Sequence, residues 1–356
     1  MTRQSMSLKV PKDQGEKTIT LANKLGLVDK TLEIQRDGIS IYIPLSRQPS
    51  KTVLKTLKQQ ISNIEVLAYA FSERLRKPKT LLEILEGQLP PHLLAVLPRS
   101  ADIVGDIAII EIPPELEEYR TVVGEAVLKV YKNVRTVLAK AGAIGGTYRL
   151  RGFSVVAGEP RVATLHKEHG CQFYVDVTKT YFSPRLSSEH HRVANLVQEG
   201  ETIVDLFAGI GPFALPIAKI HENVKVYAVD INPAAIELLE RNVRLNRVEN
   251  KVYPFLGDAR QVVKERLSGI ADRVIMNLPE KAMEFVDVAC MALKPTGGIV
   301  HFYGFVSSSE PIEKMLQRFT ESVTTTGRRA ERVLTTKLVR ATAPYEWQAV
   351  LDVKIR

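Results

Sequence analysis

The stretch TIVDLFAGIGPFA at residues 202–214 decides the fold that we expect for this chain. It reads as an apolar strand that ends in Asp205 and runs into a turn with two glycines, which let a backbone approach a ligand closely. A second apolar run ends in Asp230, where an acid commonly binds ribose hydroxyls, and a third ends in GDA at residues 257–259. In this order the three features predict a nucleoside-type ligand at the ends of parallel strands.

The residues after the second glycine separate two kinds of nucleoside cofactor. The turn lacks G-x-G-x-x-G, because Phe213 and then Leu215 follow Gly211. A pyrophosphate needs that open helix N-terminus, whereas a methionine moiety does not. The turn therefore favours S-adenosylmethionine over a dinucleotide. DLFAGIGPFA resembles motif I of class I methyltransferases, and GDA resembles the motif whose acid contacts the adenine amino group.

The patterns on either side of this stretch divide the chain into three expected domains. From residue 183 to 356 strand and helix patterns alternate, which predicts a doubly wound α/β sheet of the class I (Rossmann-like) methyltransferase type. Residues 76–182 mix strands with one or two helices and predict an α+β middle domain. Residues 1–75 predict a small N-terminal α/β domain with a helix at 15–28, a strand at Ile39–Leu45 and a helix near Ile61–Leu75. The basic run that follows reads as a linker.

Composition sets the class of partner and the compartment. The 356 residues carry 49 Lys and Arg against 40 Asp and Glu, a net charge of +9, which fits a nucleic-acid partner but also simple solubility. No stretch approaches the ~20 apolar residues of a membrane helix, and the first residues lack the apolar run of a signal peptide. The two cysteines, Cys171 and Cys290, form no metal-type pair and indicate a reducing compartment. We expect a cytoplasmic protein with no membrane contact.

A fourth strand pattern ends in Asn277-Leu278-Pro279. The carboxyl end of such a strand is where doubly wound sheets place chemistry, and an amide side chain can bond the edge of a planar base. A plain turn with Asn and Pro explains the same residues.

Four stretches together resemble the archaeal and eukaryotic tRNA (guanine-37 N1)-methyltransferase family. They are TLHKEHG at 164–170, YFSPRLSSE at 181–189, RVIMNLPEKAMEFVDVA at 273–289 and TAPYEWQAVLDVKI at 342–355. The match covers nearly all of residues 100–356 and, more loosely, the N-terminal segment. The resemblance implies methyl transfer from S-adenosylmethionine to N1 of guanosine 37 in the tRNA anticodon loop, with an N-terminal domain that docks the tRNA. We expect the enzyme to act as a monomer.

The resemblance also implies roles for individual residues. Glu189 matches the general base, Arg149 the arginine that supports guanine O6, Tyr181 an aromatic beside the target, and Asn277 and Pro279 the motif that lines the base site. The positions implied for cofactor binding are His190, Asp205, Phe207, Gly209, Asp230, Ile231, Asp258, Ala259 and Asn277. Two residues depart from the family pattern. His190 stands where close relatives often carry an arginine against the cofactor carboxylate, and Glu280 stands at an often basic position.

The chemistry of the reaction agrees with these roles. Guanine N1 carries a proton and is a poor nucleophile, so a carboxylate must remove that proton as the methyl group transfers. Negative charge then develops on O6, where a guanidinium stabilises it. No metal is required.

Simpler interpretations of the same residues stay open. Glu189 fits a first-turn helix acid, Arg149 a solvated strand residue or a phosphate contact, and Tyr181 and Phe182 core aromatics. The run at residues 166–169 reads as a polar turn rather than a metal site. The alternative functions are transfer of an aminocarboxypropyl group in wyosine biosynthesis, methylation of the tricyclic wyosine precursor, and RNA binding without catalysis.

Overall fold

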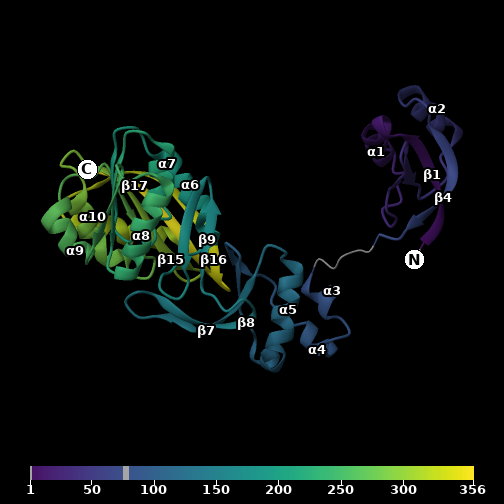
Figure 1. Cartoon of the computed structure of the whole chain (residues 1–356). Helices are drawn as coiled ribbons and strands as arrows, with labels where there is room; N and C mark the ends of the chain where they lie inside the picture. The colour runs from purple at the N-terminus through teal and green to yellow at the C-terminus, as the bar shows by residue number, and fades with distance from the viewer. Residues whose placement is uncertain (1, 75–79) are drawn as a thin grey trace. The chain divides into compact units, whose positions relative to one another are not determined.

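The structure is a computed structural model that describes residues 2–74 and 80–356. The chain divides into two compact units, Met1–Lys79 and Thr80–Arg356 (Figure 1). No helix in the described residues is long and apolar enough to cross a membrane. Most of the predicted basic linker lies outside the described residues.

The first unit is a four-stranded sheet in the order β2-β3-β1-β4 with two helices. Its elements are β1 (Thr2–Pro11), α1 (Gly15–Lys24), β2 (Gln35–Arg36), β3 (Ser40–Pro44), α2 (Lys51–Gln60) and β4 (Glu65–Ser72). The predicted helix at 15–28 and strand at Ile39–Leu45 correspond to α1 and β3.

The predicted helix near Ile61–Leu75 is wrong over the described residues. The helix lies earlier, as α2, because the Ser50 side chain accepts a hydrogen bond from Val53 N and caps it. The chain then pairs antiparallel with β1 as β4, which buries Phe71 completely. Pairing with a strand at the start of the chain thus outweighs the local helical pattern.

The second unit begins with an α+β part. Its elements are α3 (Leu81–Leu85), α4 (Pro91–Leu94), β5 (Asp102–Val104), β6 (Ile107–Ile110), α5 (Arg120–Val130), β7 (Thr136–Gly145) and β8 (Leu150–Gly158), followed by the hairpin of β9 (Ala163–Glu168) and β10 (Cys171–Asp176). The sheet order is β5-β6-β7-β8. The polar turn expected at residues 166–169 is wrong in part, because residues 166–168 belong to β9 and pair with β10. Residue 182 does not divide two compact units, and a domain boundary there stays a prediction.

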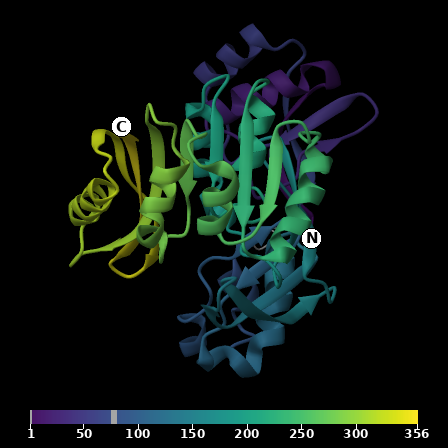
Figure 2. The same cartoon turned by 90° about the vertical axis from the view of Figure 1, so that its left-hand side faces the viewer.

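The rest of the second unit is built on a seven-stranded sheet in the order β13-β12-β11-β14-β15-β17-β16. Its elements are α6 (Ser187–Leu196), β11 (Thr202–Asp205), α7 (Ala214–Ile220), β12 (Lys225–Asp230), α8 (Pro233–Asn246), β13 (Val252–Leu256), α9 (Ala259–Val262), β14 (Arg273–Met276), α10 (Val286–Ala292), β15 (Gly298–Ser307), α11 (Ile312–Thr325), β16 (Ala330–Ala343) and β17 (Glu346–Ile355). Strands β11 to β15 are parallel, and β17 pairs antiparallel with β15 and β16. Figure 2 shows these strands side by side.

Alternation along these strands produces two apolar layers. Ile203 and Ile275 belong to the core cluster shared with α7 and α8, whereas their neighbours Val204 and Val274 belong to the cluster shared with α10 and α11. A parallel sheet covered on both faces is what near-continuous apolar strands predict. The predicted α/β class I methyltransferase fold is therefore confirmed.

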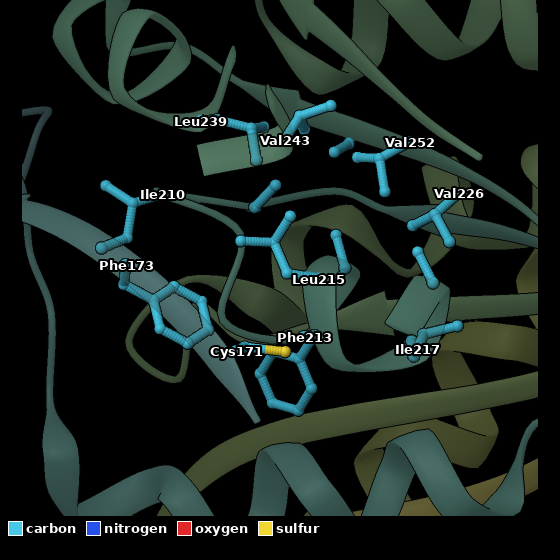
Figure 3. Close-up of a cluster of buried hydrophobic side chains, with 14 of the residues drawn as sticks. Cys171, Phe173, Ile210, Phe213, Leu215, Ile217, Val226, Leu239, Val243 and Val252 are labelled. Atoms are coloured by element: carbon cyan, nitrogen blue, oxygen red, sulfur yellow. The ribbon is translucent and has the colours of Figure 1, made fainter. Parts of the chain in front are cut away.

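Strand β10 is fixed against the sheet's helices. Phe173 of β10 packs into the cluster that holds Phe213 and Leu239 (Figure 3). The amides of Asn242 and Asn246 on α8 form hydrogen bonds with the β10 backbone, for example from Tyr174 N to Asn242 Oδ1 over 2.7 Å. This attachment positions the segment after β10, which leads towards the ligand site.

Candidate active site

A cavity of about 270 Å³ opens at the carboxyl ends of β11, β12 and β14. The strand order reverses between β11 and β14, and doubly wound sheets bind ligands at such a switch point. Ten of the residues predicted as site residues line this cavity: Arg149, Tyr181, His190, Phe207, Gly209, Asp230, Ile231, Asp258, Ala259 and Asn277. Glu189, Asp205 and Pro279 do not line it.

Gly209 and Gly211, the two glycines of the turn after β11, have different structural roles. Gly209 has φ 53°, and a Cβ placed on it would have only Tyr181 O within 4 Å, at 3.9 Å, so the backbone is open to a ligand. Gly211 has φ 94°, and a Cβ there would lie 2.6 Å from Leu239 Cδ1. Gly209 therefore serves the cavity and Gly211 the packing of α8.

Asp230 joins the turn to the next strand. Its Oδ2 accepts a hydrogen bond from Gly209 N over 2.7 Å, and its Oδ1 accepts one from Asn232 N over 2.8 Å. Burial raises the pKa of Asp230, and these backbone N–H groups oppose the shift. Each carboxylate oxygen keeps a second lone pair, so Asp230 can also accept from the hydroxyls of a ribose.

Asp205 lies behind the cavity wall rather than on it. The side chain is fully buried, its Oδ1 accepts from Phe207 N over 3.3 Å, and its Oδ2 has no hydrogen-bond partner among the described residues. Burial, opposed by the hydrogen bond from Phe207 N and assisted by the nearby Asp230, raises the pKa of Asp205 to about 7. The sequence predicted that Asp205 binds the cofactor; the side chain does not line the cavity, and a role in cofactor binding stays a prediction.

The cavity wall includes apolar side chains as well as hydrogen-bonding groups. Ile231 is 41% exposed although it is a large apolar side chain, and it lines the cavity. Asp258 accepts from Arg260 N over 2.7 Å at the start of α9. Sequence reasoning missed Phe285, which lines the cavity with the Arg260 guanidinium 3.7 Å from its ring centroid. No local sequence pattern predicts Phe285 as a site residue, because its position at the cavity depends on how residues 282–292 pack against the sheet.

A buried acid orients His190. His190 Nδ1 lies 2.8 Å from Glu168 Oε1, and His166 Nε2 lies 3.4 Å from Glu168 Oε2. Burial raises the pKa of Glu168, but the two histidines outweigh that effect and hold it at about 2. The Glu168 carboxylate therefore fixes the ring of His190 at the cavity wall.

The cavity wall also includes residues expected around a target base. The Arg149 guanidinium lies 4.9 Å from the Tyr181 ring centroid, and its Nη2 donates to Glu280 Oε1 over 3.1 Å. Asn277 Oδ1 accepts from Gln348 Nε2 over 3.0 Å. Cations and aromatic rings attract one another in this geometry, so Arg149 and Tyr181 hold each other in place.

A second cavity of about 260 Å³ adjoins the first and shares Arg149 and Tyr181 with it. It is basic: five cationic side chains line it against two acidic ones. The cations are Lys140, Arg149, Arg151, Arg185 and Arg340, and the acids are Asp102 and Glu280.

Glu189 is fully buried and lines neither of these two cavities. Its Oε1 accepts hydrogen bonds from Arg192 Nε over 2.8 Å and from Tyr303 Oη over 2.9 Å. Its Oε2 has no hydrogen-bond partner among the described residues and lies 3.6 Å from Lys337 Nζ. Glu189 is also a first-turn acid of α6, so the simpler interpretation of this residue describes its position equally well.

Behind Glu189 a buried polar chain continues across the sheet. Arg192 Nη1 donates to Asp352 Oδ2 over 2.6 Å, and His301 Nδ1 lies 2.6 Å from Asp352 Oδ1. Burial raises the pKa of Asp352, but His301 and Arg192 outweigh it and hold the value at about 2. No sequence pattern indicated this chain, because its members come from α6, β15 and β17.

Comparison with known proteins places the chain in a family. The sequence profile of the TRM5/TYW2 methyltransferase domain matches residues 164–331, that of the TYW2 N-terminal domain matches 81–161, and that of the tRNA methyltransferase 5 N-terminal domain matches 7–53. The tRNA (guanine(37)-N(1))-methyltransferase Trm5b of Pyrococcus abyssi is 39% identical over 351 residues, which cover 99% of each chain. The chain belongs to the TRM5/TYW2 methyltransferase family.

Solved structures agree with membership of the TRM5/TYW2 family. The crystal structure of wild-type Trm5b from Pyrococcus abyssi has a TM-score of 0.79 at 38% identity and covers 99% of each chain. A structure of aTrm5 in complex with tRNALeu has a TM-score of 0.76 at 33% identity and covers 99% of this chain and 100% of the other. The family resemblance predicted from the sequence is therefore confirmed.

Proposed function

We propose that this chain is an S-adenosylmethionine-dependent tRNA (guanine-37 N1)-methyltransferase. The observation that carries the proposal is that Arg149, Tyr181 and Asn277 line the same cavity as the cofactor-type residues Asp230 and Asp258. The relative with matching sequence over 99% of both chains carries this activity in its name.

The cavity fits the cofactor along its length. Asp230 accepts from the ribose hydroxyls, Asp258 accepts from the adenine amino group, and Ile231 and Phe285 pack on the adenine faces. His190, oriented by Glu168, faces the methionine end, where relatives often place an arginine. When bound, S-adenosylmethionine supplies an electrophilic methyl group on its sulfonium.

The residues at the other end handle the target guanine. Arg149 and Asn277 donate hydrogen bonds towards O6, where negative charge develops. The Tyr181 ring holds the Arg149 guanidinium by a cation–π interaction. Glu189 takes the N1 proton, which requires its Oε2, now 3.6 Å from Lys337 Nζ, or a rotated side chain to come within hydrogen-bond distance of the base. Pro279 shapes the loop after β14 without lining the cavity.

The partner that supplies the guanine is tRNA. The basic second cavity takes the strand that flanks the target, because its cations outnumber its acids. Residues 1–79, a separate compact unit, dock the body of the tRNA. We expect the enzyme to work as a monomer in the cytoplasm.

Labelled cofactor distinguishes this proposal from its alternatives. Two unmodified tRNA transcripts that differ only in G or A at position 37 are incubated with cofactor labelled on the methyl group or on the carboxyl group. The proposal expects methyl label in N1-methylguanosine at position 37, only with the G transcript. Transfer of carboxyl label indicates an aminocarboxypropyl transferase, and activity only on tRNA that already carries the tricyclic base indicates precursor methylation. Cofactor binding without any transfer indicates an RNA-binding protein.

A further inference from the structure

Arg340 of β16 holds three different side chains around the target end of the cavity. Its Nε donates to Gln348 Oε1 over 2.9 Å, its Nη1 to Ser183 Oγ over 3.1 Å and its Nη2 to Tyr181 Oη over 3.1 Å. Gln348 is almost completely buried, and its Nε2 continues the chain to Asn277. Arg340 and Gln348 therefore connect β16 and β17 to the residues around the base.

The Arg340 guanidinium determines the donor and the acceptor in each hydrogen bond from Arg340 through Gln348 to Asn277. Arginine only donates, so the atom of Gln348 that faces Arg340 must be the carbonyl oxygen. The other end of the Gln348 amide is then the NH₂ group, which must meet an acceptor, and this makes the Asn277 atom the carbonyl oxygen. Only this orientation of the two amides satisfies all of the bonds.

These hydrogen bonds determine which polar atoms at the cavity wall can still bind a ligand. Asn277 lines the cavity, and its Oδ1 is already engaged, so its Nδ2 is the end left for a ligand. Tyr181 Oη accepts from Arg340, which leaves its own hydrogen to donate. Arg149 contributes further N–H groups. Asn277, Tyr181 and Arg149 therefore all present donors to this part of the cavity, which suits the O6 and N7 acceptors of guanine and opposes the 6-amino group of adenine.

We propose that Arg340 and Gln348 are positioning residues that set the preference for guanine by fixing the amide of Asn277 with its NH₂ group towards the base. The proposal rests on the proposed methylation of guanine 37. Neither residue touches the base. Both act through Asn277, and Arg340 acts also through Tyr181.

Gln348→Glu tests the proposal because it reverses the chain. A carboxylate still accepts from Arg340 but cannot donate to Asn277, whose amide then turns and presents its oxygen to the base. We expect kcat/KM on the G37 transcript to fall about 10- to 100-fold, the range of one good base contact, while kcat/KM on the A37 transcript does not fall. Gln317→Glu is the matched control: Gln317 is exposed on α11 and donates to Glu321, and its substitution should leave both values unchanged.

A double-mutant cycle shows whether the effect passes through Asn277. In an Asn277→Ala background, Gln348→Glu should change kcat/KM on G37 by less than about twofold. An equal loss in both backgrounds, or an unchanged ratio of G37 to A37 activity, overturns the proposal. If Gln348→Glu does not fold, Gln348→Met, which also cannot donate to Asn277, is measured in the same cycle with the same expected dependence on Asn277. A wild-type enzyme that fails to methylate G37 refutes the proposed function instead.

Discussion

Arg149 Nη2 donates a hydrogen bond to Glu280 Oε1 over 3.1 Å while its guanidinium lies 4.9 Å from the ring centroid of Tyr181. The acid is 131 residues away in sequence. Its carboxylate offsets the charge of the arginine that we expect to stabilise O6. The cation needed in the transition state is thus partly neutralised before the base arrives.

Glu280→Gln removes that counter-charge and keeps a hydrogen-bond acceptor for Arg149. The pair is partly exposed, so the effect is small: we expect a single-turnover methyl-transfer rate about two- to fivefold higher, equivalent to less than about 1 kcal/mol. Glu310→Gln is the control, because Glu310 also pairs with an arginine, its side chain is about as exposed as that of Glu280, and it lines neither cavity. A slower Glu280→Gln enzyme means that the carboxylate is needed to hold Arg149 in place.

Asp205→Asn should make the protein more stable at alkaline pH. Burial raises the pKa of Asp205 to about 7, against about 3.9 in the unfolded chain, so the folded state binds the extra proton between these values. The free energy of unfolding of the wild type therefore falls as pH rises from about 4 through 7. The variant's amide does not ionise, so the variant does not lose this free energy. The expected gain above pH 8 is about 2–4 kcal/mol and vanishes near pH 4. Denaturant unfolding across this pH range measures it, and a gain that does not depend on pH contradicts the assignment.

Glu168→Gln should have the opposite pH dependence. His166 and His190 hold the pKa of Glu168 at about 2, so its charged form stabilises the fold above the unfolded value of about 4.3, and this contribution is lost as pH falls through 2. The variant should be less stable than wild type by about 2–3 kcal/mol at pH 7, with the difference shrinking below pH 4. It should also weaken cofactor binding by calorimetry, since His190 loses the acid that orients it. Unchanged cofactor affinity argues that His190 does not face the cofactor.

Removal of residues 1–79 tests the docking role of the first unit. This unit has its own core, with Leu8, Ile43 and Leu57 fully buried, so its loss should leave the second unit folded. We expect a higher KM for tRNA, a weaker dependence of RNA affinity on salt because phosphate contacts are lost, and unchanged cofactor binding. Unaltered tRNA kinetics would refute a docking role.

Local patterns predicted the features that depend on neighbouring residues, and missed those that depend on distant ones. The sequence predicted the end of β11 at Asp205 and the glycine turn after it, because the chemistry of a turn depends on residues only a few positions apart. It missed Gln348, whose amide meets Asn277 across 71 positions, and the placement of Glu189 against Tyr303 across 114. A contact between strands has no local signature, since it depends on the register of the whole sheet.

Glu189→Gln tests the proposed base. Arg192 and Tyr303 both donate to Oε1, and the carbonyl of a glutamine accepts the same bonds, so the fold should survive while basicity is lost. We expect kcat to fall by roughly 10²–10⁴, the usual share of general-base catalysis, with little change in KM because the loss falls on the transition state.

The pH dependence of the activity lost in Glu189→Gln and in Arg149→Ala distinguishes the role of a base from that of a cation. The Glu189→Gln deficit should shrink as pH rises, because guanine N1 then ionises without help. Arg149→Ala should lose about 10²–10³ at every pH, since the charge on O6 lacks its partner however the proton leaves. A Glu189→Gln enzyme with a near-normal single-turnover rate at neutral pH removes Glu189 from this role. The base would then be sought at Asp258, at a water held by Asn232 or at a phosphate of the tRNA, and the buried bonds from Arg192 and Tyr303 would make Glu189 a structural acid at the start of α6.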